Sequence, residues 1–114
     1  MSNLNNRVQL IGRLGMDPEV REFGKDKKMA RIQLATSDKF KNKKGELVED
    51  TQWHNVVIWG NLAGIAEKHL QKGSEVAISG KLVHRQFETT DGKKQFVTEV
   101  NAYDLLMLRR PAKA

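Results

Sequence analysis

Apolar and polar residues alternate along five stretches of this chain, and a period of two is typical of a β-strand with one buried face. The stretches are RVQLIGRLG (7–15), MARIQLATS (29–37), TQWHNVVIWG (51–60), EVAISGKLV (75–83) and QFVTEVNAYDLLML (95–108). The positions expected to point inward in the first, second and fourth of them are Val8, Leu10, Gly12, Leu14, Ala30, Ile32, Leu34, Val76, Ile78 and Leu82. The pattern therefore predicts five strands.

The hydrophobic period changes in NLAGIAEKHLQKG (61–73), which predicts a short amphipathic helix. The apolar positions at helical spacing are Leu62, Ile65, Ala66 and Leu70. Gly60 and Asn61 are the candidate N-caps, and Gly73 is a residue type that commonly ends a helix. One helix thus lies between the third and fourth predicted strands.

Polar segments separate the predicted strands. DPEVREF (17–23) continues the chain after a turn at Asp17 and Pro18. Residues 37–50 (SDKFKNKKGELVED) lack apolar periodicity and are predicted to form a loop or a weak hairpin. The dipeptide Asp91-Gly92 is a strong signal for a hairpin between the last two strands.

Three strands, one short helix and two strands, in 114 residues, are the layout of an OB-fold. This fold is a five-stranded, partly open Greek-key barrel, and it makes the chain all-β with one helix. We expect a single OB-fold domain over residues 1–108 and a short basic tail over residues 109–114. Other small barrels fit the strands, but the position of the helix favours the OB-fold.

The composition excludes several classes of protein. The chain has no cysteine, which rules out disulfides and thiolate metal sites. It has no apolar run of membrane-spanning length and no signal-peptide pattern, so we expect a cytoplasmic protein. Its three histidines lie on separate elements, and no nucleophile, base and orienting group stand out as a set. We therefore expect no enzyme activity, no metal and no cofactor.

Charge and aromatic residues indicate a polyanionic partner. The formal net charge is +6, which either attracts a polyanion or serves solubility. Phe40 lies in the lysine-rich run KFKNKK, and Phe87 shares strand parity with Lys81 and Arg85. Rings beside cations suit unpaired nucleic acid, because its bases offer flat faces and its phosphates offer charge.

The two tryptophans, Trp53 and Trp59, have the same parity on one predicted strand, so both rings point the same way. The opposite face carries His54, Val56 and Ile58. Either face suits a core, and strand parity alone does not decide between rings inside the barrel and rings on its surface.

Several long stretches resemble the bacterial, replicative single-stranded DNA-binding proteins, and together they cover nearly all of residues 4–108. They are NRVQLIGRLGMDPEVR, RIQLATSDKF, TQWHNVVIWGNLAGIAEKHLQKGSEVAISGKL and the FETTDGK…TEV hairpin. The resemblance implies an OB-fold, a homotetramer, and binding of single-stranded DNA without marked sequence preference during replication, recombination and repair.

The resemblance also implies site residues. The family's base-stacking aromatics fall on Phe40, Trp53, Trp59 and Phe87 of this chain. Phe40 and Phe87 replace tryptophans of the best-known members, and Trp59 replaces a phenylalanine. The cations expected to contact phosphates are Arg7, Arg13, Arg31, Lys39, Lys41, Lys43, Lys44, Lys81 and Arg85.

One departure from the family pattern concerns the C-terminal end. Family members usually continue to an acidic tip that recruits replication and repair proteins, whereas this chain ends in RRPAKA, with three basic residues and no acid. Recruitment of partner proteins is therefore in doubt. Two alternatives remain open: an RNA-binding or RNA-chaperone barrel, and a replication-restart accessory that works through protein contacts.

Overall fold

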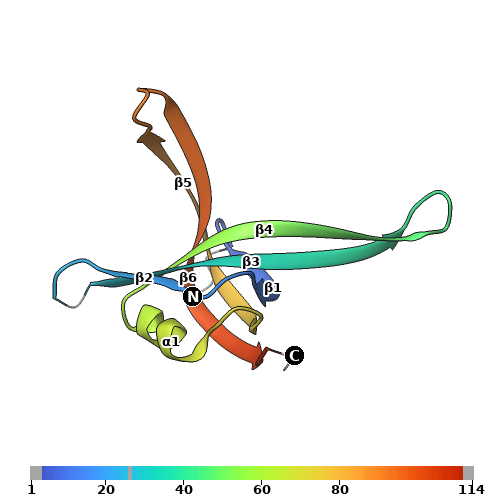
Figure 1. Ribbon diagram of the computed structural model, residues 1–114, viewed down its shortest axis with the longest axis horizontal. Helices are drawn as coiled ribbons and strands as arrows, with labels where there is room; N and C mark the ends of the chain where they lie inside the picture. The colour runs from blue at the N-terminus through green and yellow to red at the C-terminus, as the bar shows by residue number, and fades with distance from the viewer. Residues whose placement is uncertain (1–3, 26, 112–114) are drawn as a thin grey trace.

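Two long β-hairpins, two shorter strands and one helix make up the fold in this computed structural model, which describes residues 4–25 and 27–111 (Figure 1). The elements, in chain order, are β1 (Val8–Leu14), β2 (Glu19–Glu22), β3 (Lys28–Lys41), β4 (Leu47–Trp59), α1 (Asn61–His69), β5 (Glu75–Glu88) and β6 (Lys94–Arg109). The segment predicted to follow the turn at Pro18 is thus a short strand of its own, β2, paired with the edge of β3.

Five of the strands close into a barrel, in the order β1-β5-β6-β4-β3, and β3 pairs back onto β1. All of these pairings are antiparallel except that of β4 with β6, which is parallel. Helix α1 connects β4 to β5, the third and fourth strands of the barrel. The predicted OB-fold and the position of its helix are confirmed.

The barrel core is formed by the inward positions of the alternating strands. Its residues are Leu14, Ala30, Ile32, Leu34, Val56, Ile58, Ala63, Ala66, Leu70, Val76, Ile78, Val100 and Ala102. The inward faces predicted for the first two strands are confirmed, since Val8 and Leu10 also pack against this core. The prediction was wrong for Leu82, which is 38% exposed. The alternation of buried residues in β5 ends at Gly80, and Leu82 lies in the largely exposed part of the strand that continues outside the core.

Helix α1 covers one end of the barrel (Figure 1). It begins after Gly60, whose φ of 73° suits glycine, and it ends at His69, so Gly73 lies in the following turn rather than at the cap. Ala63 and Ala66 face the core, whereas Ile65 is exposed. Lys28 Nζ lies 2.7 Å from Glu67 Oε1 and ties β3 to the helix; this hydrogen bond raises the pKa of Lys28.

Two hairpin arms extend beyond the barrel, one formed by β3 and β4 and the other by β5 and β6 (Figure 1). The first contains residues 37–50 and is paired without a break as far as Lys41 and Leu47, so the segment is a regular hairpin rather than a loop. Asn42 Oδ1 accepts the backbone N–H groups of Lys44 and Glu46 and holds its turn. Both faces of this arm are largely exposed to solvent, which is why its sequence shows no apolar alternation.

Candidate nucleic-acid interface

Trp53 and Trp59 project from the outer face of β4, away from the core. The inward face of the same strand carries Val56 and Ile58, which are fully buried, whereas Trp53 is 60% and Trp59 50% exposed. The tryptophans lie opposite Ala35 and Met29 of β3, which share their side of the sheet. Neither ring belongs to the core.

Each tryptophan ring rests on a neighbouring residue. A Cβ atom on Gly15 would collide with the six-membered ring of Trp53, so this ring lies directly on the glycine backbone. The ring of Phe23 lies beside Trp59, with ring centroids 5.9 Å apart and planes tilted by 34°. These contacts fix the rings while leaving about half of their surface open.

The outer face of β4 continues across the barrel onto β6 and β5. Val57 pairs with Asn101 of β6, and β6 pairs in turn with β5, from which Arg85 and Phe87 project on the same side. We call this surface the aromatic face and define it by Trp53, Trp59 and Phe87 and by the residues that line the hollows between them. The hollow beside Trp59, about 390 Å³, is lined by Arg21, Phe23, Met29, Arg31, Val57, Trp59, Val83, Arg85, Glu99 and Asn101.

A second hollow on the aromatic face, of about 420 Å³, adjoins Phe87. It is lined by Arg31, Asn55, Arg85, Phe87, Val97 and Glu99. Three residues line both hollows: Arg31, Arg85 and Glu99. The aromatic face is therefore continuous from Phe23 at one end to Phe87 at the other, with arginines between the rings.

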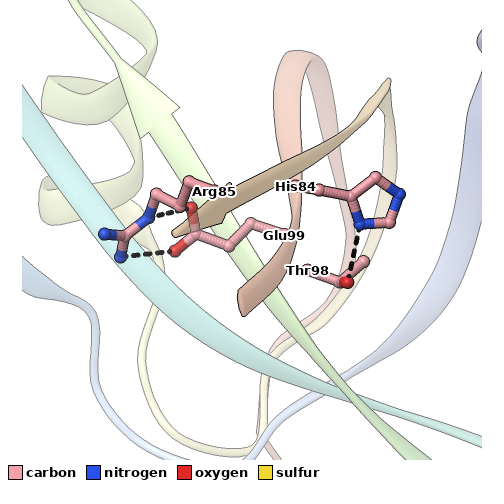
Figure 2. Close-up of polar contacts among 4 residues, drawn as sticks. All are labelled: His84, Arg85, Thr98 and Glu99. Atoms are coloured by element: carbon pink, nitrogen blue, oxygen red, sulfur yellow. Dashed lines mark hydrogen bonds and ion pairs between the residues drawn. The ribbon is translucent and has the colours of Figure 1, made fainter. Parts of the chain in front are cut away.

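Arg85 and Glu99 form an ion pair in the middle of this face (Figure 2). Arg85 Nε donates to Glu99 Oε1 at 2.8 Å and Nη2 donates to Oε2 at 3.2 Å. The Glu99 side chain is 6% exposed, whereas that of Arg85 is 46% exposed. The hydrogen bond to Glu99 and the charge of that carboxylate raise the pKa of Arg85. The pair fixes the plane of the guanidinium, whose remaining N–H groups are free to face the hollows.

His84 and Thr98 occupy the opposite face of the same hairpin, where His84 Nδ1 and Thr98 Oγ1 are 2.9 Å apart (Figure 2). The alternation of β5 therefore places Lys81 and Arg85 on one side of the strand and His84 on the other. Lys81 lines a further hollow together with Asn101 and Tyr103, next to the aromatic face.

The other predicted cations are dispersed. Arg31 lies at the centre of the aromatic face, and the exposed Arg7 precedes β1. Arg13 Nη1 donates to the carbonyl of Gly73 at 2.9 Å and its Nη2 lies 4.0 Å from Glu75, so it is already engaged at a different part of the barrel. The four lysines of the β3–β4 arm, Lys39, Lys41, Lys43 and Lys44, are exposed along its distal half.

Phe40 is separated from the other predicted aromatic residues. It pairs with Val48 on the β3–β4 arm, five residues beyond the Ala35–Trp53 pair, and the odd spacing places it on the opposite face of this arm from Trp53. It is 50% exposed. Three of the four predicted rings therefore share one face, and the fourth lies out along an arm.

Comparisons with known proteins place these features in a family. The profile of the Single-strand binding protein family matches residues 5–108. The chain belongs to this family. It is 43% identical over 104 residues to "Single-stranded DNA-binding protein 1" of Chlorobaculum tepidum, an alignment that covers 90% of this chain. Among solved structures, "Plasmodium falciparum SSB complex with ssDNA" superposes with a TM-score of 0.83 at 32% identity, covering 91% of this chain and 95% of that one.

This family member spans 64% of the length of the Chlorobaculum relative. In the part of the chain that the structure describes, no cluster of histidine and carboxylate side chains is suited to hold a metal ion. The helix found within the same residues is too short to cross a membrane. The end of the predicted basic tail, residues 112–114, lies outside the described residues.

Sequence reasoning did not single out several residues of the aromatic face, among them Arg21, Phe23 and Glu99. The sequence did contain a signal for the first two residues. Val20 points inward, so strand alternation places Arg21 and Phe23 on the outer side. Glu99 gave no signal, since its proximity to Arg85 depends on the register of the β5–β6 hairpin. The five-residue turn Thr89–Lys93 that sets this register is longer than the two-residue turn that Asp-Gly most often forms.

Proposed function

We propose that this protein binds single-stranded DNA without marked sequence preference. Bases would stack on Phe40, Trp53, Trp59 and Phe87. The phosphates would be contacted by Arg7, Arg13, Arg31, Lys39, Lys41, Lys43, Lys44, Lys81 and Arg85. The single observation that carries the proposal is the aromatic face, on which half-exposed aromatic rings share one surface with Arg31 and Arg85.

The physical basis of this proposal is the chemistry of unpaired strands. A nucleobase that is not paired presents a flat π-face, and stacking on an aromatic side chain contributes about 1–3 kcal/mol per base whatever the base. Duplex DNA keeps those faces within its own stack. The ring of Trp53 rests on Gly15, and the ring of Trp59 lies beside Phe23. Exposed rings that are held in place in this way are suited to stacking with the bases of a single strand.

We further propose that binding serves to protect single strands during replication, recombination and repair, in the cytoplasm at the nucleoid, without catalysis. The names of the two similar proteins, each of which refers to single-stranded DNA, support the binding on which this role depends.

We also propose assembly into a homotetramer. Ile11 of β1 pairs with Ala77 of β5, which pairs with Leu106 of β6, and these three residues form an apolar row on the outside of the barrel. Ile11 and Leu106 are more than half exposed. An outward apolar row across three neighbouring strands is suited to a symmetric contact between copies of the chain.

The test of the proposed function is a titration of the intrinsic tryptophan fluorescence with matched oligonucleotides. We expect single-stranded DNA to quench the emission of Trp53 and Trp59 at much lower concentration than duplex DNA of the same length. RNA of the same sequence is added as a competitor, because tighter binding of RNA would indicate the RNA-chaperone alternative. Equal affinity for duplex and single strand would contradict the proposal.

A further inference from the structure

We infer that Phe23 is an additional base-stacking residue, which extends the path of the DNA strand beyond Trp59 and onto the β2–β3 hairpin. The inference rests on the proposed function and adds a subsite to the same face. It involves neither of the two hairpin arms, and it concerns a residue to which the sequence pattern assigned no role.

The backbone holds Phe23 at a defined place. Phe23 directly follows β2, and its N–H donates to the carbonyl of Lys27 at 2.7 Å, which closes the turn into β3. The four pairs of β2 with β3, from Glu19–Arg31 to Glu22–Lys28, anchor this turn to the barrel. The ring is therefore presented by a short paired segment.

The barrel itself does not require this ring. Within the described residues, Phe23 belongs neither to the buried core nor to the partly buried side chains packed against it, a role that Val20 of the same strand fills. Phe23 is 49% exposed, and its aromatic neighbour is Trp59, itself half exposed. Phe23 and Trp59 together form an exposed aromatic pair, and this pair is available to stack with a ligand.

The ring pair has a geometry that defines where bases can lie. A base between two rings needs about 6.8 Å between them, twice the 3.4 Å base step. The centroids of Phe23 and Trp59 are 5.9 Å apart and their planes are tilted by 34°, so no base fits between them. The open sides of the two rings remain, and we infer that each carries one base of the same strand.

Charge on the same part of the surface favours a nucleic-acid occupant. Arg21 of β2 points to the same side as Phe23, and both residues line the hollow beside Trp59. Arg31 of β3 lines the same hollow. The hollow is continuous with the remainder of the aromatic face through Arg31 and Arg85. Stacking surface and cations thus occur together, the combination that an unpaired strand requires.

The experiment compares binding of fluorescein-labelled oligo-dT to the wild type and to Phe23→Ala, Phe23→Leu and Phe23→Trp. We expect the alanine and leucine variants to bind about fivefold or more weakly, the lower end of one base stack. The tryptophan variant should bind at least as tightly as the wild type. Leucine keeps an apolar side chain but has no ring. A loss of affinity in Phe23→Leu would therefore show that the ring stacks with a base and does not only make a hydrophobic contact.

Phe96→Ala provides a matched control. Phe96 is an exposed phenylalanine that pairs with Gln86, on the opposite face of the β5–β6 arm from Phe87. We expect this variant to keep wild-type affinity. An equal loss in Phe96→Ala and Phe23→Ala would overturn the inference, as would unchanged affinity of Phe23→Leu. A wild type that fails to bind oligo-dT would instead overturn the proposed function.

Photocrosslinking gives a readout that is independent of affinity. Oligo-dT that contains 5-iodouracil is irradiated with the full chain, and the crosslinked protein is digested with trypsin. Cleavage after Arg21 and Lys25 releases the peptide EFGK, whose one aromatic residue is Phe23. We expect a crosslink on this peptide. Crosslinks confined to peptides with Trp53, Trp59 or Phe87 would contradict the inference.

Discussion

At the residue scale, a buried carboxylate lies beneath a surface that we propose to bind a polyanion. Glu99 is 5% exposed, and Arg85 covers it with two hydrogen bonds. The arginine is therefore partly neutralised, which lowers its attraction for phosphate but fixes its orientation. Arg31, which lines the same hollows, is the stronger candidate for direct phosphate contact.

The Arg85–Glu99 pair leads to a prediction about stability. Arg85→Ala removes both hydrogen bonds to the buried carboxylate and should lower the free energy of unfolding by about 1–3 kcal/mol, less than for a fully buried pair because Arg85 is itself half exposed. Adding Glu99→Gln to this variant removes the buried charge and should restore at least about 1 kcal/mol of the loss. Chemical denaturation at a fixed protein concentration measures both. A double variant less stable than Arg85→Ala would contradict the prediction.

At the element scale, the barrel closes because β1 can approach two neighbouring strands at once. β1 pairs with β5 along most of its length and with β3 at Arg13 and Leu14. Gly12 lies at this junction, where a Cβ atom would collide with the carbonyl oxygen of Ala35. The colliding group is backbone within a paired strand, so it cannot move aside without disturbing the barrel.

We therefore expect Gly12→Ala to destabilise the fold by about 1–3 kcal/mol, the usual effect of overpacking. Gly64→Ala in helix α1 is the matched control, because a Cβ atom on Gly64 would meet no neighbouring atom within 4 Å. This second change should stabilise the protein by about 0.5–1 kcal/mol through the higher helix propensity of alanine. Thermal melting tests both predictions: the melting temperature should fall in Gly12→Ala and rise in Gly64→Ala. Equal melting temperatures would show that the β1–β3 contact is not tight.

Strands were predictable from the sequence wherever one face is buried, as in β1 and in the barrel half of β3. The pattern failed where that condition does not hold. The β3–β4 arm has two solvated faces, and Leu82 lies in the largely exposed part of β5 that follows Gly80. The face of Trp53 and Trp59 could not be assigned, because Val57 on their side is as buried as Val56 on the other and both faces therefore look apolar.

The candidate site was predictable in part for a similar reason. Residue type and strand parity singled out Phe40, Trp53, Trp59 and Phe87 and placed Arg85 beside Phe87, and family resemblance assigned the four rings to base stacking. The side of the β3–β4 arm that carries Phe40 and the contact of Arg85 with Glu99 depend on hairpin registers. Turn lengths set those registers, and the sequence did not fix the turn lengths.

At the scale of the whole molecule, the net charge of +6 should make binding depend on salt. Each phosphate contact on a single strand contributes about −0.7 to the slope of log affinity against log salt. We expect Arg31→Ala to reduce the magnitude of this slope by about 0.7, and Lys68→Ala on helix α1 to leave it unchanged. Affinity for oligo-dT that stays constant from low to moderate salt would contradict the prediction.

Assembly is testable at the same scale. Light scattering at micromolar concentration should give the mass of four 13.0 kDa chains. Ile11→Glu places a charge in the apolar row of Ile11, Ala77 and Leu106 and should shift the protein to smaller species, because a buried unpaired charge is unfavourable. A wild type that is monomeric under these conditions would remove the proposed tetramer, while the proposed DNA binding would stand.

The aromatic face is tested most directly by binding and thermal melting measured on the same Trp53→Ala and Trp59→Ala variants. Each change removes a half-exposed ring from the surface, so each should weaken binding to single-stranded DNA by about 1–3 kcal/mol. The melting temperature should remain close to that of the wild type. A ring buried in the core would behave differently, since its removal destabilises a protein by roughly 3–5 kcal/mol. Loss of the fold in both variants, or full affinity in both, would contradict the proposal that these rings are stacking platforms for bases.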